Sequence, residues 1–280
     1  MRAFWQLLKK AVAGFQADDA MSAGAALAFY TALSIAPLLL LVIVVAGTLF
    51  GQEAARGEIA HQLNDLIGPQ GAEAVQTMLT KTQTPGGGLV STLIGVGTLL
   101  FAATGVFVQL QDALDTVWNV TPEARAGGLR ALVRDRLLSI SMICAMAFLL
   151  LVSLVFGAVV NGLAGAFERW LPYSSVWIGA ANVGVGFLVT ALMFGVIFKV
   201  LPHAQPGWAD VWVGAVLTAA LFTVGKYLIG LYLGSTAVAS AYGAAGSFVV
   251  LLFWIYYSSL ILLFGAEFTQ AHAAARAAKA

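Results

Sequence analysis

The chain has 280 residues, of which 60% are hydrophobic and only 10% are charged, and its formal net charge is +1. Soluble domains carry about 25% charged residues, so this composition indicates a membrane protein and weighs against a soluble enzyme. A net charge near zero gives no general electrostatic footprint for nucleic acid. The single cysteine, Cys144, excludes an intramolecular disulfide and a cysteine metal cluster.

Six stretches are apolar enough and long enough to cross a bilayer, because a hydrocarbon core about 30 Å thick takes about 20 apolar residues as a helix. In chain order they are Leu27–Phe50, Leu89–Leu110, Leu137–Val160, Val176–Leu201, Trp208–Leu233 and Ala244–Phe268. The sequence therefore predicts an all-α polytopic membrane protein with six transmembrane helices. We expect one membrane domain over residues 1–280, with a tail at 269–280.

Residues 1–19, which precede the first span, have an amphipathic pattern. Phe4, Leu8, Val12 and Phe15 recur at helical spacing, and Lys9 lies off that face. A helix of this kind can lie in the headgroup region of a membrane. The sequence therefore predicts an N-terminal interfacial helix.

The first span belongs to a longer helical pattern, which runs from Ala20 to Phe50. Its first half is rich in small residues, which permit close helix approach, and Pro37 precedes a more apolar second half. Proline removes a backbone hydrogen bond. Two alternatives follow: a helix that breaks at Pro37, or a long tilted helix with an ordinary proline kink.

Residues 51–88 are the longest polar segment between two spans. Apolar stripes at helical spacing cover Ile59–Ile67 and Val75–Leu79, and Gly68-Pro69 separates them. This pattern predicts an outer helical hairpin, which is either a lid or a static cap. The uncharged stretch Gly234–Gly246 is either a short outer turn or a re-entrant piece.

Basic residues are distributed unevenly between the two sides of the predicted bundle. Ten Lys and Arg residues lie in the N-terminal segment, the second loop, the end of the fourth span and the tail, whereas the other side has three. The positive-inside rule places the richer side in the cytoplasm. Both termini are therefore expected to be cytoplasmic, which agrees with an even number of spans.

Lys226 is the ionisable residue that lies deepest in a predicted span, roughly 10 Å from the outer end at helical rise. Asn182 lies at about the same level, and Tyr242 is also on the outer side. Charged groups in lipid are costly and often functional, so these three are candidate contacts for an anionic substrate. The alternative is that Lys226 snorkels outward along its own stem.

Three charged residues, Asp112, Lys199 and Glu267, end the second, fourth and sixth spans on the predicted inner side. They could meet at one depth. Other ionisable residues are predicted on the same side, namely Asp115, His203 and Asp210. This set is either a structural ion-pair cluster at the cytoplasmic boundary or an inner gate whose pairs break when the protein opens inward.

The sequence contains no recognisable catalytic or metal-binding arrangement. The three histidines are far apart and have no spacing typical of metal ligands. There is no glycine-rich phosphate loop ending in Gly-Lys-Ser/Thr and no Gly-x-Ser-x-Gly nucleophile setting. We therefore expect no enzyme activity, no metal and no cofactor.

Several segments together resemble the YihY/virulence factor BrkB family of bacterial inner-membrane proteins. The segments that carry the resemblance are 25–30 with Ser34 and Pro37, Gln111 to Trp118-Asn119, Leu201-Pro202 with Trp208, and Tyr242-Gly243 through Trp254, Tyr256, Ser258 and Gly265-Ala266-Glu267. The resemblance implies six spans, cytoplasmic termini and a bacterial inner (plasma) membrane. Members were once labelled ribonuclease BN, a label that this sequence does not support.

The resemblance supplies neither a substrate nor catalytic residues, although a transporter or lipid-handling role has been suggested for members. The leading hypothesis is a transporter-like protein that moves or binds an anionic or amphipathic envelope molecule, a lipid being one candidate. The alternative is a non-transporting scaffold for envelope partners. Expected partners are membrane lipids and that substrate, with a homo-oligomer or an envelope protein as further candidates.

Overall fold

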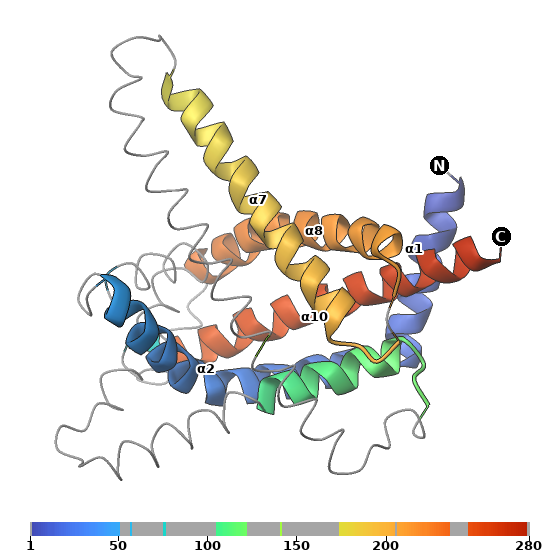
Figure 1. The fold of residues 1–280 in the computed structure, drawn as a ribbon, viewed down its shortest axis with the longest axis horizontal. Coiled ribbons are helices and arrows are strands. Elements are labelled where there is room, and N and C mark those ends of the chain that lie inside the picture. The colour runs from blue at the N-terminus through green and yellow to red at the C-terminus, as the bar shows by residue number, and fades with distance from the viewer. Residues whose placement is uncertain are drawn as a thin grey trace.

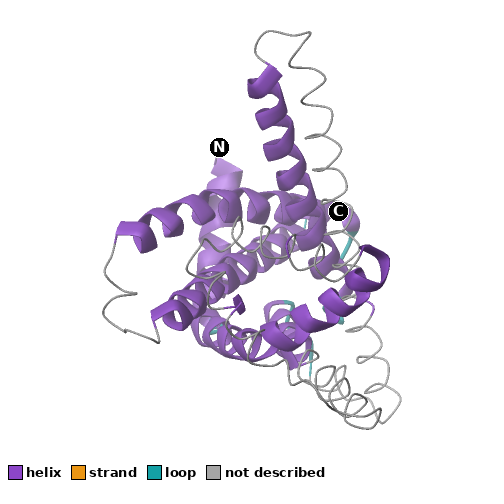
Figure 2. Cartoon of the chain, turned by 90° about the vertical axis from the view of Figure 1, so that its left-hand side faces the viewer, coloured by secondary structure: helices purple, strands orange, loops and turns teal. Residues whose placement is uncertain are grey.

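The computed structural model describes residues 2–50, 57, 75–76, 105–121, 141, 174–204, 206–235 and 246–278. All regular structure in these residues is α-helical, and Figure 2 shows the described residues as helices with a few short loop pieces. The long helices are α1 (Arg2–Ala17), α2 (Ala20–Phe50), α7 (Ser174–Val200), α8 (Trp208–Ser235) and α10 (Gly246–Ala277). A further helical segment covers residues 105–117.

Three of the described helices are long and apolar enough to cross a membrane. The qualifying stretches are Val183–Val200, Trp208–Ile229 and Phe248–Ala277, and they match the fourth, fifth and sixth predicted spans. A helix suits this environment because all its backbone groups bond within the segment, where lipid offers no partner. The predicted hairpin at 51–88, the third span and most of the second span lie largely outside the described residues.

Helix α10 is central among the described helices. It packs against α1, α2 and α8, and α8 also packs against α7. In Figure 1, α10 runs between α8 and α2, and the two ends of the chain lie at the same end of the molecule. This arrangement brings the C-terminal half of α10 close to α1 and to the start of α8.

The contact between α8 and α10 is built from two reciprocal pairs of glycine and threonine. A Cβ atom at Gly214 would overlap the side chain of Thr269, and one at Gly265 would overlap Thr218. Each threonine hydroxyl donates to the glycine carbonyl four residues earlier in its own helix, at 2.7 Å in both cases. The two backbones therefore approach closely through shape, as small residues allow in membrane helices.

Helix α1 packs one face on the C-terminal half of α10. The rings of Phe4 and Phe268 lie 5.8 Å apart, those of Phe15 and Phe264 lie 6.1 Å apart, and Ala11 is fully buried. Part of the face that the sequence assigned to lipid headgroups is thus covered by protein. Three large apolar side chains of α1 nevertheless remain exposed, namely Phe4, Trp5 and Val12.

Helix α2 is continuous from Ala20 to Phe50, so it does not end at Pro37. The loss of one backbone donor at proline can be absorbed as a kink, and Figure 1 shows α2 changing direction part of the way along. The first half of α2 approaches α10 closely, because a Cβ atom at Gly24 would lie 2.9 Å from Leu260. The small-residue half therefore packs on another span, as its composition indicated.

Candidate functional site

Asp115 of the helical segment 105–117 binds the loop between α7 and α8. This carboxylate is 1% exposed and accepts the backbone N–H of His203 at 2.8 Å. Its second oxygen lies 2.7 Å from Nδ1 of the same histidine. A carboxylate that binds both a backbone amide and the imidazole ring fixes the position and the orientation of His203.

Gln111 adds a second bond between the same two segments. Its side-chain amide donates to the carbonyl of Leu201 at 3.1 Å in a buried setting. Buried polar groups are costly unless they are paired, so Gln111 satisfies a carbonyl at the end of α7. Gln111 and Asp115 therefore bind the segment 105–117 to the residues that follow α7, although Gln111 and Leu201 are 90 residues apart in the sequence.

Lys199, at the end of α7, contacts the residues at the start of α8. Its Nζ donates to the carbonyl of Pro206 at 2.7 Å and lies 5.8 Å from the ring centre of Trp208. The cation also lies in the last turn of α7, where the helix dipole favours positive charge. Lys199 thus has local partners, and its described contacts do not include Asp112 or Glu267.

Asp210 connects the start of α8 to the end of α10. One of its oxygens lies 3.2 Å from Nδ1 of His272 and 3.5 Å from an Nη of Arg276. Asp210 stands in the first turn of α8, where negative charge suits the helix dipole. The bond to the exposed Arg276 is long, so the histidine is the closer partner.

Glu267 is buried where α1 crosses α10. It is 3% exposed, and a Cβ atom at Gly14 would overlap its carboxyl group. Gly14 also accepts the backbone N–H of Asp18 at 2.8 Å, which places Asp18 next to this contact. Oε1 of Glu267 has no hydrogen-bond partner among the residues that the structure describes.

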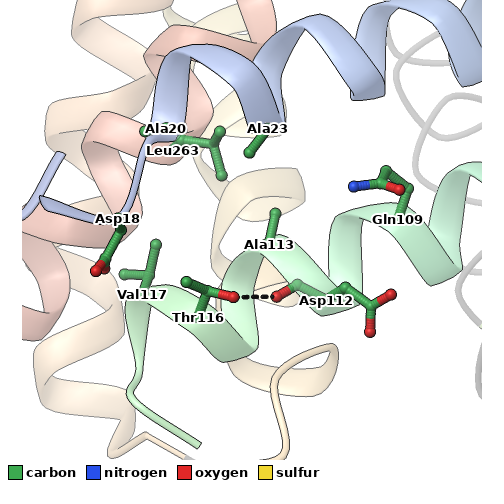
Figure 3. Close-up of a pocket in the computed structure, with 9 residues that line it drawn as sticks. All are labelled: Asp18, Ala20, Ala23, Gln109, Asp112, Ala113, Thr116, Val117 and Leu263. Carbon is green, nitrogen blue, oxygen red and sulfur yellow. Dashed lines mark hydrogen bonds between the residues drawn. The ribbon is translucent and has the colours of Figure 1, made fainter. Parts of the chain in front are cut away.

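A small pocket with both polar and apolar walls lies between the start of α2 and the helical segment 105–117 (Figure 3). Its volume is about 130 Å³. Figure 3 shows Asp18 at one end, Gln109 and Asp112 at the other, and Thr116 donating to the Asp112 carbonyl, a bond of 2.9 Å. Asp112 therefore lies on a pocket that also borders Asp18, the neighbour of Glu267.

A larger apolar cavity of about 250 Å³ lies among α2, α7, α8 and α10. Its walls are mainly aromatic and aliphatic side chains, and its polar groups are hydroxyls. The aromatic and hydroxyl-bearing residues of its wall are Thr31, Phe194, Phe222, Trp254, Ser258 and Ser259. Both serine hydroxyls donate to carbonyls of their own helix, at 2.9 Å each.

Lys226 lies on α8, one helical turn beyond Phe222, and its side chain is partly buried. Its Nζ is 5.6 Å from the ring centre of the exposed Tyr227. Asn182 is in α7, but its side chain is outside the described set, as is Tyr242 altogether. Of the three predicted outer residues, Lys226 is thus the one whose side chain the structure describes.

The residues of the predicted inner trio lie in different surroundings: Asp112 borders the pocket, Lys199 binds Pro206 and Glu267 lies against Gly14. Sequence reasoning missed other contacts that the structure reveals, namely His272 with Asp210 and Gln111 with Leu201. None of these pairings has a local sequence signal. In the described part of the chain, no group of three or more His, Cys, Asp or Glu side chains is arranged to hold a metal ion.

Two known proteins of similar sequence are named as membrane proteins. The chain is 24% identical over 265 residues to a UPF0761 membrane protein of Psychrobacter sp. (strain PRwf-1), which covers 94% of this chain and 48% of that protein. It is 27% identical over 260 residues to a UPF0761 membrane protein of Verminephrobacter eiseniae (strain EF01-2), which covers 91% and 59%. The chain thus spans about half to three-fifths of the length of these two relatives.

A third relative carries a different name. YfkH of Bacillus subtilis (strain 168), which is named as ribonuclease-like, is 26% identical over 269 residues, covering 93% of this chain and 92% of that protein. No solved structure matches the chain. The family model described as virulence factor BrkB matches residues 11–280. With apolar helices of membrane-spanning length and this match over nearly its whole length, the chain belongs to the virulence factor BrkB family of membrane proteins.

Proposed function

We propose that this chain is a six-span protein of a bacterial inner membrane that binds or moves an anionic or amphipathic envelope molecule, with a lipid as the preferred class. The proposal includes an N-terminal helix at the membrane interface, an outer hairpin at 51–88, and termini in the cytoplasm. The observation that carries it is the apolar cavity among α2, α7, α8 and α10.

The size of the cavity suits a segment of an apolar chain. Its volume of about 250 Å³ is smaller than the roughly 300–1,000 Å³ of pockets that enclose a drug-sized ligand. Lipid tails are as apolar as leucine, so transfer of a chain from the bilayer into the cavity gains little. Polar groups near the cavity must therefore supply selectivity for a ligand.

Lys226 is suited to that task. Residues four apart lie on the same face of a helix, so Lys226 follows Phe222, which lines the cavity, on one face of α8. An ammonium group beside an apolar cavity is complementary to a molecule that has both an anion and a chain. Binding of this kind needs no catalytic group, so we propose a protein that is not an enzyme and uses no cofactor.

The test uses two threonine variants of the full chain. Thr31→Phe places a ring in the cavity, whereas Thr190→Phe adds the same bulk on α7 at a residue that is not among the lining residues. We expect native mass spectrometry in mild detergent to show an anionic lipid at fixed stoichiometry in the unaltered protein and in Thr190→Phe. Thr31→Phe should lose it.

A different lipid pattern in the same spectra would contradict the proposal. Loosely bound bulk phospholipid in all three proteins would remove the cavity from the function. Together with capture of an envelope protein, that result would favour a non-transporting scaffold.

A further inference from the structure

Glu267 is a buried acid that the proposed ligand site does not use. On α1, Gly14 lies against its carboxyl group and leaves no room for a side chain. The carbonyl of Gly14 accepts the backbone N–H of Asp18 at 2.8 Å, so Asp18 stands next to the same contact. Two neighbouring carboxylates repel each other, whereas one proton shared between them makes a hydrogen bond. Charged groups buried without a partner are strongly disfavoured.

The remaining charged groups on the neighbouring elements have other positions or other partners. On α8, Asp210 is paired with His272 and Arg276 of α10. On the segment 105–117, Asp115 is paired with His203, and Asp112 borders the pocket that Asp18 also lines. Other titratable groups stand on exposed positions of α1 and the following turn, namely Lys9, Lys10 and Asp19.

We infer that Asp18 and Glu267 together hold one proton at the contact between α1 and α10, and that this proton keeps α1 docked on α10. The site is thus a proton-binding site. It goes beyond the proposed ligand site and does not depend on it, because the two are lined by different residues. The unpartnered Oε1 of Glu267 marks the carboxyl group as one that the described protein groups do not fully satisfy.

The pocket that Asp18 borders gives the proton a route. Asp18 lies between this pocket and the Gly14 contact of Glu267, so a proton can pass from water in the pocket to Asp18 and then to Glu267. When the proton leaves to water, two carboxylates remain in contact. Their repulsion acts directly across the interface that Phe4–Phe268 and Phe15–Phe264 hold together. Loss of the proton therefore separates α1 from α10.

The experiment measures the α1–α10 distance in the full chain. Spin labels are placed at the exposed positions Gln6→Cys on α1 and Ala274→Cys on α10, in a Cys144→Ser background in lipid nanodiscs. Double electron–electron resonance should give one short distance in acidic buffer and loss of that population in alkaline buffer. Glu267→Gln, which keeps the shape and removes the charge, should retain the short distance in both.

Asp19→Asn is the matched control, because it removes a neighbouring exposed carboxylate. Asp19 has a φ of 47°, which asparagine tolerates, so this variant should respond to pH as the unaltered protein does. A pH response that persists in Glu267→Gln would overturn the proton site. A short distance that is lost when Na⁺ replaces K⁺ at constant pH would also overturn it, in favour of a metal cation.

Infrared difference spectroscopy of the unaltered protein keeps the proposal testable if Glu267→Gln fails to fold. We expect a protonated carboxyl band in acidic buffer that is lost in alkaline buffer. Absence of that band throughout would overturn the proposal. Since neither measurement requires a lipid ligand, failure of the proton site and failure of the proposed function remain distinguishable.

Discussion

Asp115 binds His203 twice, through the backbone N–H at 2.8 Å and through Nδ1 at 2.7 Å, although the two residues are 88 positions apart. The carboxylate is buried and the imidazole is partly exposed. Asp115 therefore joins the segment 105–117 to the α7–α8 loop at two atoms of one residue. The hydrogen bond from Gln111 to the carbonyl of Leu201 is a further contact between the segment 105–117 and the residues after α7.

The strength of the Asp115–His203 contact can be measured with a double-mutant cycle. Asp115→Ala should lower the free energy of unfolding by about 1–3 kcal/mol, because it leaves the backbone N–H of His203 without its acceptor. His203→Ala should cost less, since that N–H keeps its bond. Unfolding in detergent should give a coupling energy of about 0.5–3 kcal/mol. A coupling of zero would mean that the imidazole contact adds no stability.

Two lysines of the spans should respond differently to the same substitution. Lys226→Met should abolish retention of an anionic lipid and leave the melting temperature unchanged, because the described contact of Lys226 is with the exposed ring of Tyr227. Lys199→Met should keep the lipid but lose about 1.5–3 kcal/mol of stability, the usual worth of a hydrogen bond to a charged group. Native mass spectrometry and thermal unfolding check both. Retention of lipid by Lys226→Met would remove that lysine from the site.

Two glycines offer a matched test of close packing. Gly214→Ala should destabilise the protein by about 1–3 kcal/mol, the usual range for overpacking, because the new Cβ would overlap Thr269. Gly184→Ala should be tolerated, since its Cβ would meet no atom of the described residues within 4 Å. Thermal unfolding of both variants gives the comparison. If Gly214→Ala and Gly184→Ala unfold at the same temperature, the α8–α10 contact accommodates the added methyl group without loss of stability.

The sequence predicted the helices of the later spans well. The predicted spans at 176–201 and 208–233 differ by only a few residues from α7 and α8, because long apolar runs have few alternatives to a helix in lipid. The sixth span was predicted to end at Phe268, whereas α10 continues to Ala277. Its last residues are alanine-rich, which favours helix without adding the apolar signal of a span.

The partners of the charged residues could not be predicted in the same way. The sequence placed Glu267 at the inner end of the predicted sixth span and offered Lys199 and Asp112 as partners, whereas α10 continues beyond Glu267 to Ala277. The structure instead packs α1 on α10, so Glu267 lies against Gly14 and beside Asp18. An amphipathic pattern shows that α1 has an apolar face, but it does not reveal whether lipid or protein covers that face.

The glycine–threonine pairs of α8 and α10 have a consequence for biogenesis. Thr218 and Thr269 each satisfy their hydroxyl within their own helix, so neither hydroxyl needs a partner on the other helix in hydrocarbon. At this contact the two segments can enter the bilayer one after the other during synthesis without an unpaired hydroxyl. Association of the glycine–threonine surfaces then depends on their matching shapes.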